Sequence, residues 1–85
     1  MQIKFKKAIL AFQIEKEIDE VDLDLNWLIY NGEIEVKKLD KSASIDGVVN
    51  NDKSITLSIS TTLKMEPVLS AISPLIIKLN YLREL

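Results

Sequence analysis

The chain has 85 residues, with 11 basic and 13 acidic side chains, a formal net charge of −2, and neither cysteine nor histidine. This size and charge predict one small domain, residues 1–85, with a thin core and no strong bulk attraction to nucleic acid. The missing residue types exclude disulfides, thiolate metal sites and histidine-based acid–base catalysis.

Residues 2–14 alternate loosely between polar and apolar side chains, which favours a β-strand whose second half is buried on both faces. A helix is the alternative, because several apolar residues of this segment also share a helical face. The apolar run Ala8–Phe12 is too short for a signal peptide or a membrane span, so we expect a cytoplasmic protein without membrane contact.

Basic side chains on this first strand are candidates for nucleic-acid contact. They either contact phosphates or keep an edge strand soluble. The candidates are Lys4, Lys6 and Lys7, together with Lys41 further along the chain.

Residues 16–30 permit two interpretations, because their apolar residues fit both a helical repeat and the alternation of a strand. Asn31-Gly32 follows, which is a strong hairpin signal and also an acceptable helix end. Glu33–Lys38 then alternates as a short strand. The local pattern favours a hairpin at 20–38 over a strand–helix–strand unit.

Six carboxylates crowd residues 15–24, which predicts a solvated or partner-facing acidic surface. Asp22 and Asp24 could hold Mg²⁺ or Ca²⁺, but the segment lacks the spaced ligands and turning glycine of a calcium loop, so we expect no metal. Trp27 and Tyr30 are expected in the core or in an interface, with an exposed base-stacking platform as the alternative.

Residues 43–62 predict two strands joined by a turn. Ala43–Val49 is the first strand, 50–52 (Asn-Asn-Asp) is the turn, and Lys53–Thr62 is the second strand. The apolar residues at odd positions in 55–59 are expected to face the core, and the serine and threonine residues at even positions in 54–60 are expected to face solvent.

The segment Met65–Leu85 is the most apolar of the chain and has a clear helical period. Pro74 removes a backbone donor in its interior, and Ser73 before it is a typical cap. The pattern therefore predicts either a kinked helix at 66–84 or a short turn at 66–72 followed by a helix at 74–84. One stripe is expected to cover the sheet: Val68, Ile72, Leu75, Leu79 and Leu82.

Apolar residues occupy more of this last helix than one sheet can cover, and a contiguous exposed apolar patch usually marks an interface. We expect a homodimer, a heterodimer with a similar small subunit, or membership of a larger complex. The expected interface residues are Leu69, Ile76, Ile77, Tyr81 and Leu85.

The expected fold class is α+β, an antiparallel sheet packed against a long C-terminal helix. Only Gly32 and Gly47 are glycines, so no glycine-rich phosphate loop exists, and without histidine no base can activate a serine. We therefore expect a non-enzymatic interaction subunit that uses no cofactor. Two other functions fit the charge pattern: a small nucleic-acid-binding protein that uses the basic strand, and a viral or mobile-element inhibitor or accessory protein that uses the acidic segment.

With a helix at 16–30, the order strand, helix, strand, strand, helix resembles the small dimerisation subunit of the KEOPS complex, which makes threonylcarbamoyladenosine in tRNA. Lys41-Ser42 stands where that family's second strand opens with Arg-Ser, and Thr61-Thr62 stands in the link to the last helix. The family's arginine motifs are replaced here by Val68–Ala71 and Ser73–Ile76. The resemblance implies a non-catalytic subunit that dimerises and docks on a catalytic subunit, and the missing arginines favour the dimer-partner role.

Overall fold

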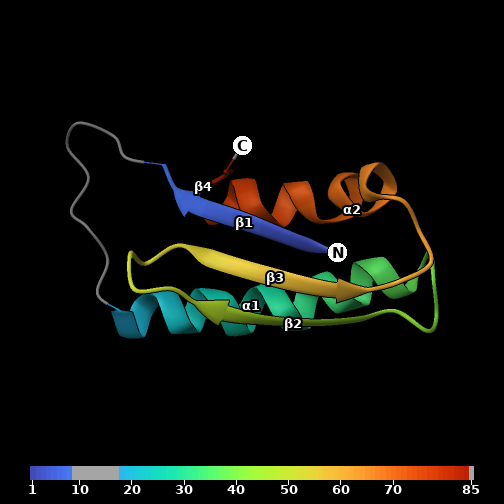
Figure 1. Ribbon diagram of the computed structural model, residues 1–85, viewed down its shortest axis with the longest axis horizontal. Helices are drawn as coiled ribbons and strands as arrows, with labels where there is room; N and C mark the ends of the chain where they lie inside the picture. The colour runs from blue at the N-terminus through green and yellow to red at the C-terminus, as the bar shows by residue number, and fades with distance from the viewer. Residues whose placement is uncertain (9–17, 85) are drawn as a thin grey trace.

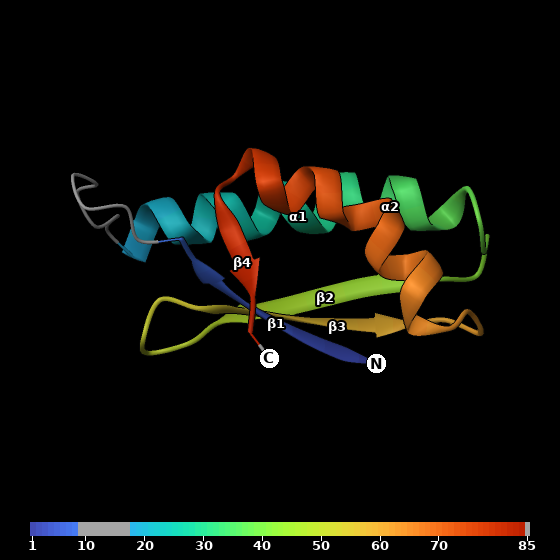
Figure 2. The same ribbon diagram turned by 90° about the horizontal axis from the view of Figure 1, so that it is seen from above.

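The computed structural model describes residues 1–8 and 18–84, which form a layer of two helices on a four-stranded sheet (Figure 1). Neighbouring strands are antiparallel and lie in the order β2-β3-β1-β4. Figure 2 shows that both helices lie on the same side of the sheet, so no helix of the described residues covers its other face, called here the open face. The predicted α+β class with an antiparallel sheet is confirmed. In chain order the elements are β1 (Gln2–Lys7), α1 (Ile18–Lys37), β2 (Ser44–Val49), β3 (Ile55–Ser60), α2 (Met65–Lys78) and β4 (Tyr81–Arg83).

Alternating apolar residues on the three longer strands build the sheet side of the core. Ile3 lies opposite Leu57 and Phe5 lies opposite Ile55, and all four side chains are buried. The predicted strand pair at 43–62 is confirmed, although each strand is shorter than expected. The first strand is confirmed only for 2–7, because the rest of the predicted strand falls largely on residues 9–17, which lie outside the described residues.

The predicted hairpin at 20–38 is wrong, because this segment forms the helix α1. The helix buries one apolar stripe against the sheet, which the alternation of a strand could not do with the same residues. Asp and Asn side chains are poor helix formers, but tertiary packing outweighs their propensity. The residues of this stripe are Val21, Leu25, Leu28, Gly32 and Val36.

Gly32 lies inside α1 and not in a hairpin turn. A Cβ atom at this position would lie 3.3 Å from Ile45 Cδ1 and 3.7 Å from Ile72 Cγ2. The glycine therefore lets the helix approach both β2 and α2 closely. The Asn-Gly pair is a packing feature in this chain: Asn31 Nδ2 donates a hydrogen bond to the Trp27 carbonyl within the helix.

The last helix is kinked but shorter than predicted. α2 contains Pro74 and ends at Lys78 (65–78, not 66–84), and Figure 2 shows that its axis changes direction along its length. Ser73 does not cap a second helix; its hydroxyl donates to the Leu69 carbonyl four residues earlier, as interior serines do. Val68 and Ile72 of the predicted stripe are buried in the core.

Asn80 ends the helical region and turns the chain back into the sheet. Its φ is +64°, a left-handed conformation that asparagine tolerates better than most residues. The chain then adds β4 to the edge of β1, so Leu82 lies opposite Lys6 on a strand and not on the predicted helical stripe. This return was not visible in the helical period of the sequence, because a strand of three residues carries almost no periodic signal.

Candidate interaction surfaces

A second apolar stripe runs along the outer side of α1. A helix turns by about 100° per residue, so spacings of four, three and four residues place side chains on one face. Leu23 and Tyr30 are 68% and 69% exposed, and Ile34 is 44% exposed. This face points away from the stripe that packs on the sheet. The outer stripe of α1 consists of Leu23, Trp27, Tyr30 and Ile34.

Trp27 connects the outer stripe to α2. Its ring is partly buried against the core, and Lys78 Nζ lies 5.5 Å from the ring centroid. Such a cation–aromatic contact is worth about 0.5–1 kcal/mol at an exposed site. Ile77, the neighbour of Lys78, is 73% exposed on the side of α2 that faces away from the core. The apolar surface of the helical layer therefore includes residues of both helices.

Charged side chains of opposite sign lie at the two ends of α1. Glu20 and Asp22 are exposed near its start, and Lys37 and Lys38 are exposed at its end. This distribution complements the helix dipole. The lysines also form ion pairs one turn back, with Glu33 at 3.0 Å and Glu35 at 3.0 Å.

The predicted interface on the last helix is not a single surface. Ile76 and Tyr81 are buried in the core of this chain, so they cannot contact a partner in this fold. Leu69 is partly buried against the core, Ile77 is exposed, and Leu85 lies outside the described residues. The expectation of a flank on one helix was wrong because Tyr81 belongs to β4 and not to α2.

Tyr81 joins the final strand to the first helix. Its hydroxyl donates a hydrogen bond of 3.1 Å to Asp24 Oδ2 in a buried environment. Burial raises the pKa of the Tyr81 hydroxyl, and the negative charge and hydrogen bond of Asp24 raise it further. Asp24 is therefore a structural carboxylate beneath the helical layer, rather than part of an exposed acidic face or a cation site.

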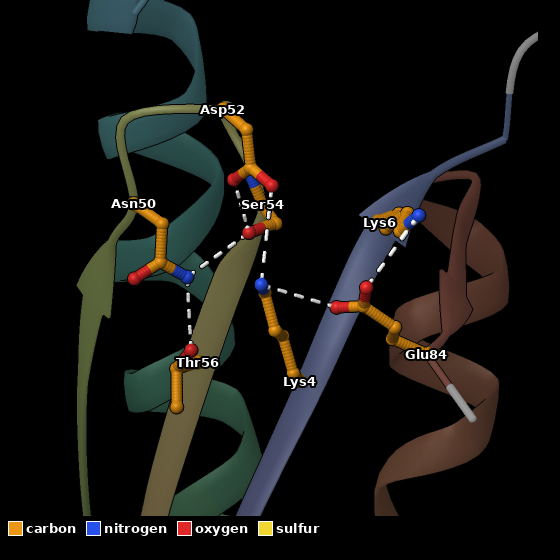
Figure 3. Close-up of polar contacts among 7 residues, drawn as sticks. All are labelled: Lys4, Lys6, Asn50, Asp52, Ser54, Thr56 and Glu84. Atoms are coloured by element: carbon orange, nitrogen blue, oxygen red, sulfur yellow. Dashed lines mark hydrogen bonds and ion pairs between the residues drawn. The ribbon is translucent and has the colours of Figure 1, made fainter.

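The open face of the sheet carries charged side chains, and two of its lysines are paired within the chain. Lys4 Nζ lies 3.2 Å from Glu84 and 3.9 Å from Asp52, and Lys6 Nζ lies 3.5 Å from Glu84. Figure 3 shows Lys4 between the two carboxylates and Glu84 between the two lysines. The two lysines predicted to contact nucleic acid thus face two acidic groups that offset their charge.

The turn between β2 and β3 adds a polar network beside these ion pairs (Figure 3). Asn50 Nδ2 donates to the hydroxyl oxygens of Ser54 and Thr56, at 3.0 and 2.9 Å. The Ser54 hydroxyl and amide both donate to Asp52, and these bonds, together with the charge of Lys4, hold the pKa of the Asp52 carboxyl below its usual range. Ser54 is consequently buried and not solvated as predicted.

The two remaining candidate lysines do not join Lys4 and Lys6 in one patch. Lys7 is the last residue of β1 and lies opposite the buried Tyr81, on the other face of the sheet from Lys6, whereas Lys41 is exposed in the turn between α1 and β2. Figure 1 places that turn at the end of the sheet where β1 begins, so the two lysines lie toward opposite ends. The sequence suggested a basic strand, but the fold separates its charges and pairs two of them.

Asp40 ties the turn after α1 to the link before α2. Its carboxylate accepts hydrogen bonds from the Thr61 hydroxyl at 2.7 Å, the Ser42 hydroxyl at 2.8 Å and the Thr62 amide at 3.2 Å. These bonds, led by that from Thr61, hold the pKa of Asp40 well below its usual range. The segments that carry the resemblance, 41–42 and 61–62, are thereby linked through one carboxylate.

Sequence reasoning missed the outer stripe as a set, although the signal was present. Once α1 is read as a helix, the spacings of Leu23, Trp27, Tyr30 and Ile34 define a second face in addition to the core stripe. Only the hairpin interpretation hid it, because a strand divides these residues between its two faces.

No family model matches the chain, and no curated protein or solved structure is significantly similar to it. Within residues 1–8 and 18–84, no three acidic side chains gather in a way that could hold a metal ion. In the same part of the chain, no helix is both long enough and apolar enough to cross a bilayer.

Proposed function

We propose that the chain is a non-enzymatic protein-interaction subunit that binds its partner through the outer stripe of α1. The observation that carries this proposal is the exposure of Leu23 and Tyr30 on the side of the helix opposite the core. Burial of a large apolar side chain is worth about 1.5–3 kcal/mol, so covering this stripe would supply several kcal/mol of binding free energy.

The composition supports a non-catalytic role. The chain has no histidine and no cysteine, which are the most common general base and the most reactive nucleophile in enzymes. The exposed lysines do not support a nucleic-acid-binding role as strongly, because Lys4 and Lys6 lie against Glu84 and Asp52. Protein contact through an apolar helix face is the function that these features favour.

A role as an accessory subunit of a tRNA-modifying assembly like KEOPS is the more specific form of this proposal. It is supported by the element order β-α-β-β-α, which precedes the short final strand. In that role the chain would dimerise and contribute no catalytic group. Mixing the chain with a purified catalytic subunit of such a complex, followed by size-exclusion chromatography, tests this form separately.

The general proposal is tested with Tyr30→Lys and a matched control on the other surface, Val48→Lys, since Val48 is 57% exposed on the open face of the sheet. The assembly size of each variant is measured by size-exclusion chromatography in a cell extract and after purification. We expect Tyr30→Lys to reduce the assembly size and Val48→Lys to leave it unchanged. Identical sizes for the parent and Tyr30→Lys in both settings would refute the proposal.

A further inference from the structure

The spacing of the residues in the outer stripe of α1 is the same in both directions along the helix. The residues follow spacings of four, three and four, so the midpoint of the stripe falls between residues 28 and 29. Rotation by 180° about an axis through that midpoint places a second copy of α1 antiparallel to the first. Leu23 then lies opposite Ile34 of the second copy, and Trp27 lies opposite Tyr30 of the second copy. A face with this symmetry is complementary to itself, which a two-fold dimer requires.

The charges at the ends of α1 favour the same antiparallel pairing. With the axis between residues 28 and 29, Glu20 of each copy lies opposite Lys37 of the other, whereas Asp22 lies opposite Glu35; a parallel arrangement would place Glu20 opposite Glu20 and Lys37 opposite Lys37. The intrachain ion pairs of Lys37 and Lys38 do not oppose this, because exposed pairs on one helix are worth only about 0.3–0.5 kcal/mol. Lys37 can therefore interact with Glu20 of the second copy as well.

The helical layer also offers enough length for such a contact. With 20 residues, α1 extends for about 30 Å, and the molecule measures 39 Å along its longest axis. Ile77 of α2 adds exposed apolar surface next to Lys78, which already contacts Trp27. A standard protein–protein interface buries about 800 Å² on each partner, and exposed side chains of both helices could contribute to it.

We infer that the partner is a second copy of this chain, bound by antiparallel packing of the two α1 helices about a two-fold axis between residues 28 and 29. This inference rests on the proposed function, because it specifies the partner of the same surface. The hydrophobic centre supplies affinity, and the charged ends select the antiparallel orientation over the parallel one.

Disulfide cross-linking tests the geometry directly, because the chain has no cysteine of its own. Oxidation of the double variant Leu23→Cys/Ile34→Cys should yield a covalent dimer, since the cysteine at position 23 of each copy lies opposite the cysteine at position 34 of the other. Within one copy the two positions are about 16 Å apart along the helix, which is too far for an internal disulfide. The single variants and the control Leu23→Cys/Val48→Cys should remain uncrosslinked. Efficient cross-linking of Leu23→Cys alone, or covalent species larger than a dimer, would overturn the antiparallel two-fold arrangement.

A charge exchange provides a second test that needs no cysteine. Glu20→Lys and Lys37→Glu should each self-associate at least ~10-fold more weakly than the parent, because each places like charges opposite each other at both ends of the dimer. An equimolar mixture should restore dimerisation, because both ends of the mixed pair then carry opposite charges. A mixture that dimerises no better than either variant would overturn the inference.

Light scattering of the purified parent separates the homodimer inference from the more general proposal of a protein-interaction subunit. A strict monomer at 100 µM, a concentration on the order of the weakest transient complexes, would overturn the homodimer. The proposed function would survive that result if Tyr30→Lys still reduced the assembly size in the cell extract, because a different chain would then occupy the surface.

Discussion

The outer stripe of α1 and the open face of the sheet are both exposed, but they differ in what is exposed: two lysines of the open face are paired within the chain, whereas the outer stripe is mainly apolar. On the open face, Lys4 and Lys6 lie beside Glu84 and Asp52, and the polar side chains of the adjoining turn bond to one another. On α1, Leu23 and Tyr30 expose apolar surface to water. Exposed charge can be paired locally, but exposed apolar surface is removed from water only by another body. A binding surface is therefore better sought on α1 than among the lysines.

The largest expected effect comes from matched leucines on the two surfaces. Leu23 on the outer stripe is 68% exposed, and Leu82 on the open face is 62% exposed. Leu23→Lys should weaken self-association by ~30-fold or more, equivalent to ~2 kcal/mol, because it buries a charge against Ile34 of the second copy, whereas Leu82→Lys should change it by less than about three-fold. Analytical ultracentrifugation over a concentration series measures both. Equal losses for the two variants would remove the distinction between the surfaces.

The contact beneath α1 should matter for folding rather than for association. Tyr81→Phe removes a buried hydrogen bond to the Asp24 carboxylate and should lower the free energy of unfolding by about 1–3 kcal/mol. Because the folded-state pKa of Tyr81 is raised, its contribution is fully present below pH ~10 and is lost as the pH rises further. Urea unfolding at pH 7 and pH 11 should show a smaller difference between parent and variant at the higher pH. A difference that grows with pH would contradict this assignment.

Asp40 should show the opposite pH dependence, because its folded-state pKa is lowered by its hydrogen bonds. Its stabilising contribution is present above the ordinary aspartate pKa of about 3.9 and is lost as the pH falls below it. Asp40→Asn should therefore lower the urea midpoint at pH 7, and the difference from the parent should shrink toward pH 2. Thr61→Val removes the hydrogen bond that lowers the pKa of Asp40 most, and it should reproduce part of the effect. A pH-independent difference would show that the charge of Asp40 is not what stabilises the turn.

The smallest effect on stability is expected on the open face. Glu84→Gln breaks exposed or half-exposed ion pairs and should change the free energy of unfolding by less than about 1 kcal/mol. It should, however, strengthen any salt-sensitive binding to single-stranded DNA, because Lys4 and Lys6 lose their carboxylate partner. Lys4→Gln/Lys6→Gln/Lys7→Gln should abolish such binding, as measured by fluorescence anisotropy at two salt concentrations. Binding that persists in the triple variant would place the nucleic-acid site elsewhere.

The strand pair at 43–62 was predictable because its evidence is local. Apolar residues alternate through Ile55, Leu57 and Ile59, and a turn-forming run precedes them, so neighbouring residues are enough to define the hairpin. The kink in α2 was predictable for the same reason, since Pro74 removes a hydrogen bond wherever a helix contains it. The candidate site was less predictable, because only Ile77 of the five expected interface residues is both described and largely exposed.

By itself, the sequence indicated the α+β class, the strand pair at 43–62 and the break in the last helix, because these depend on residues that are close together in the chain. Only the tertiary structure decided that Asn31-Gly32 lies inside a helix, where the space left by Gly32 admits Ile45 and Ile72, which are distant in sequence. The tertiary structure also places the Tyr81 side chain in the core, where its hydroxyl contacts Asp24, and pairs the strand that carries Tyr81 with β1. Leu23 and Tyr30 are exposed because the opposite side of α1 packs on the core, and a helix cannot bury both of its faces against one sheet.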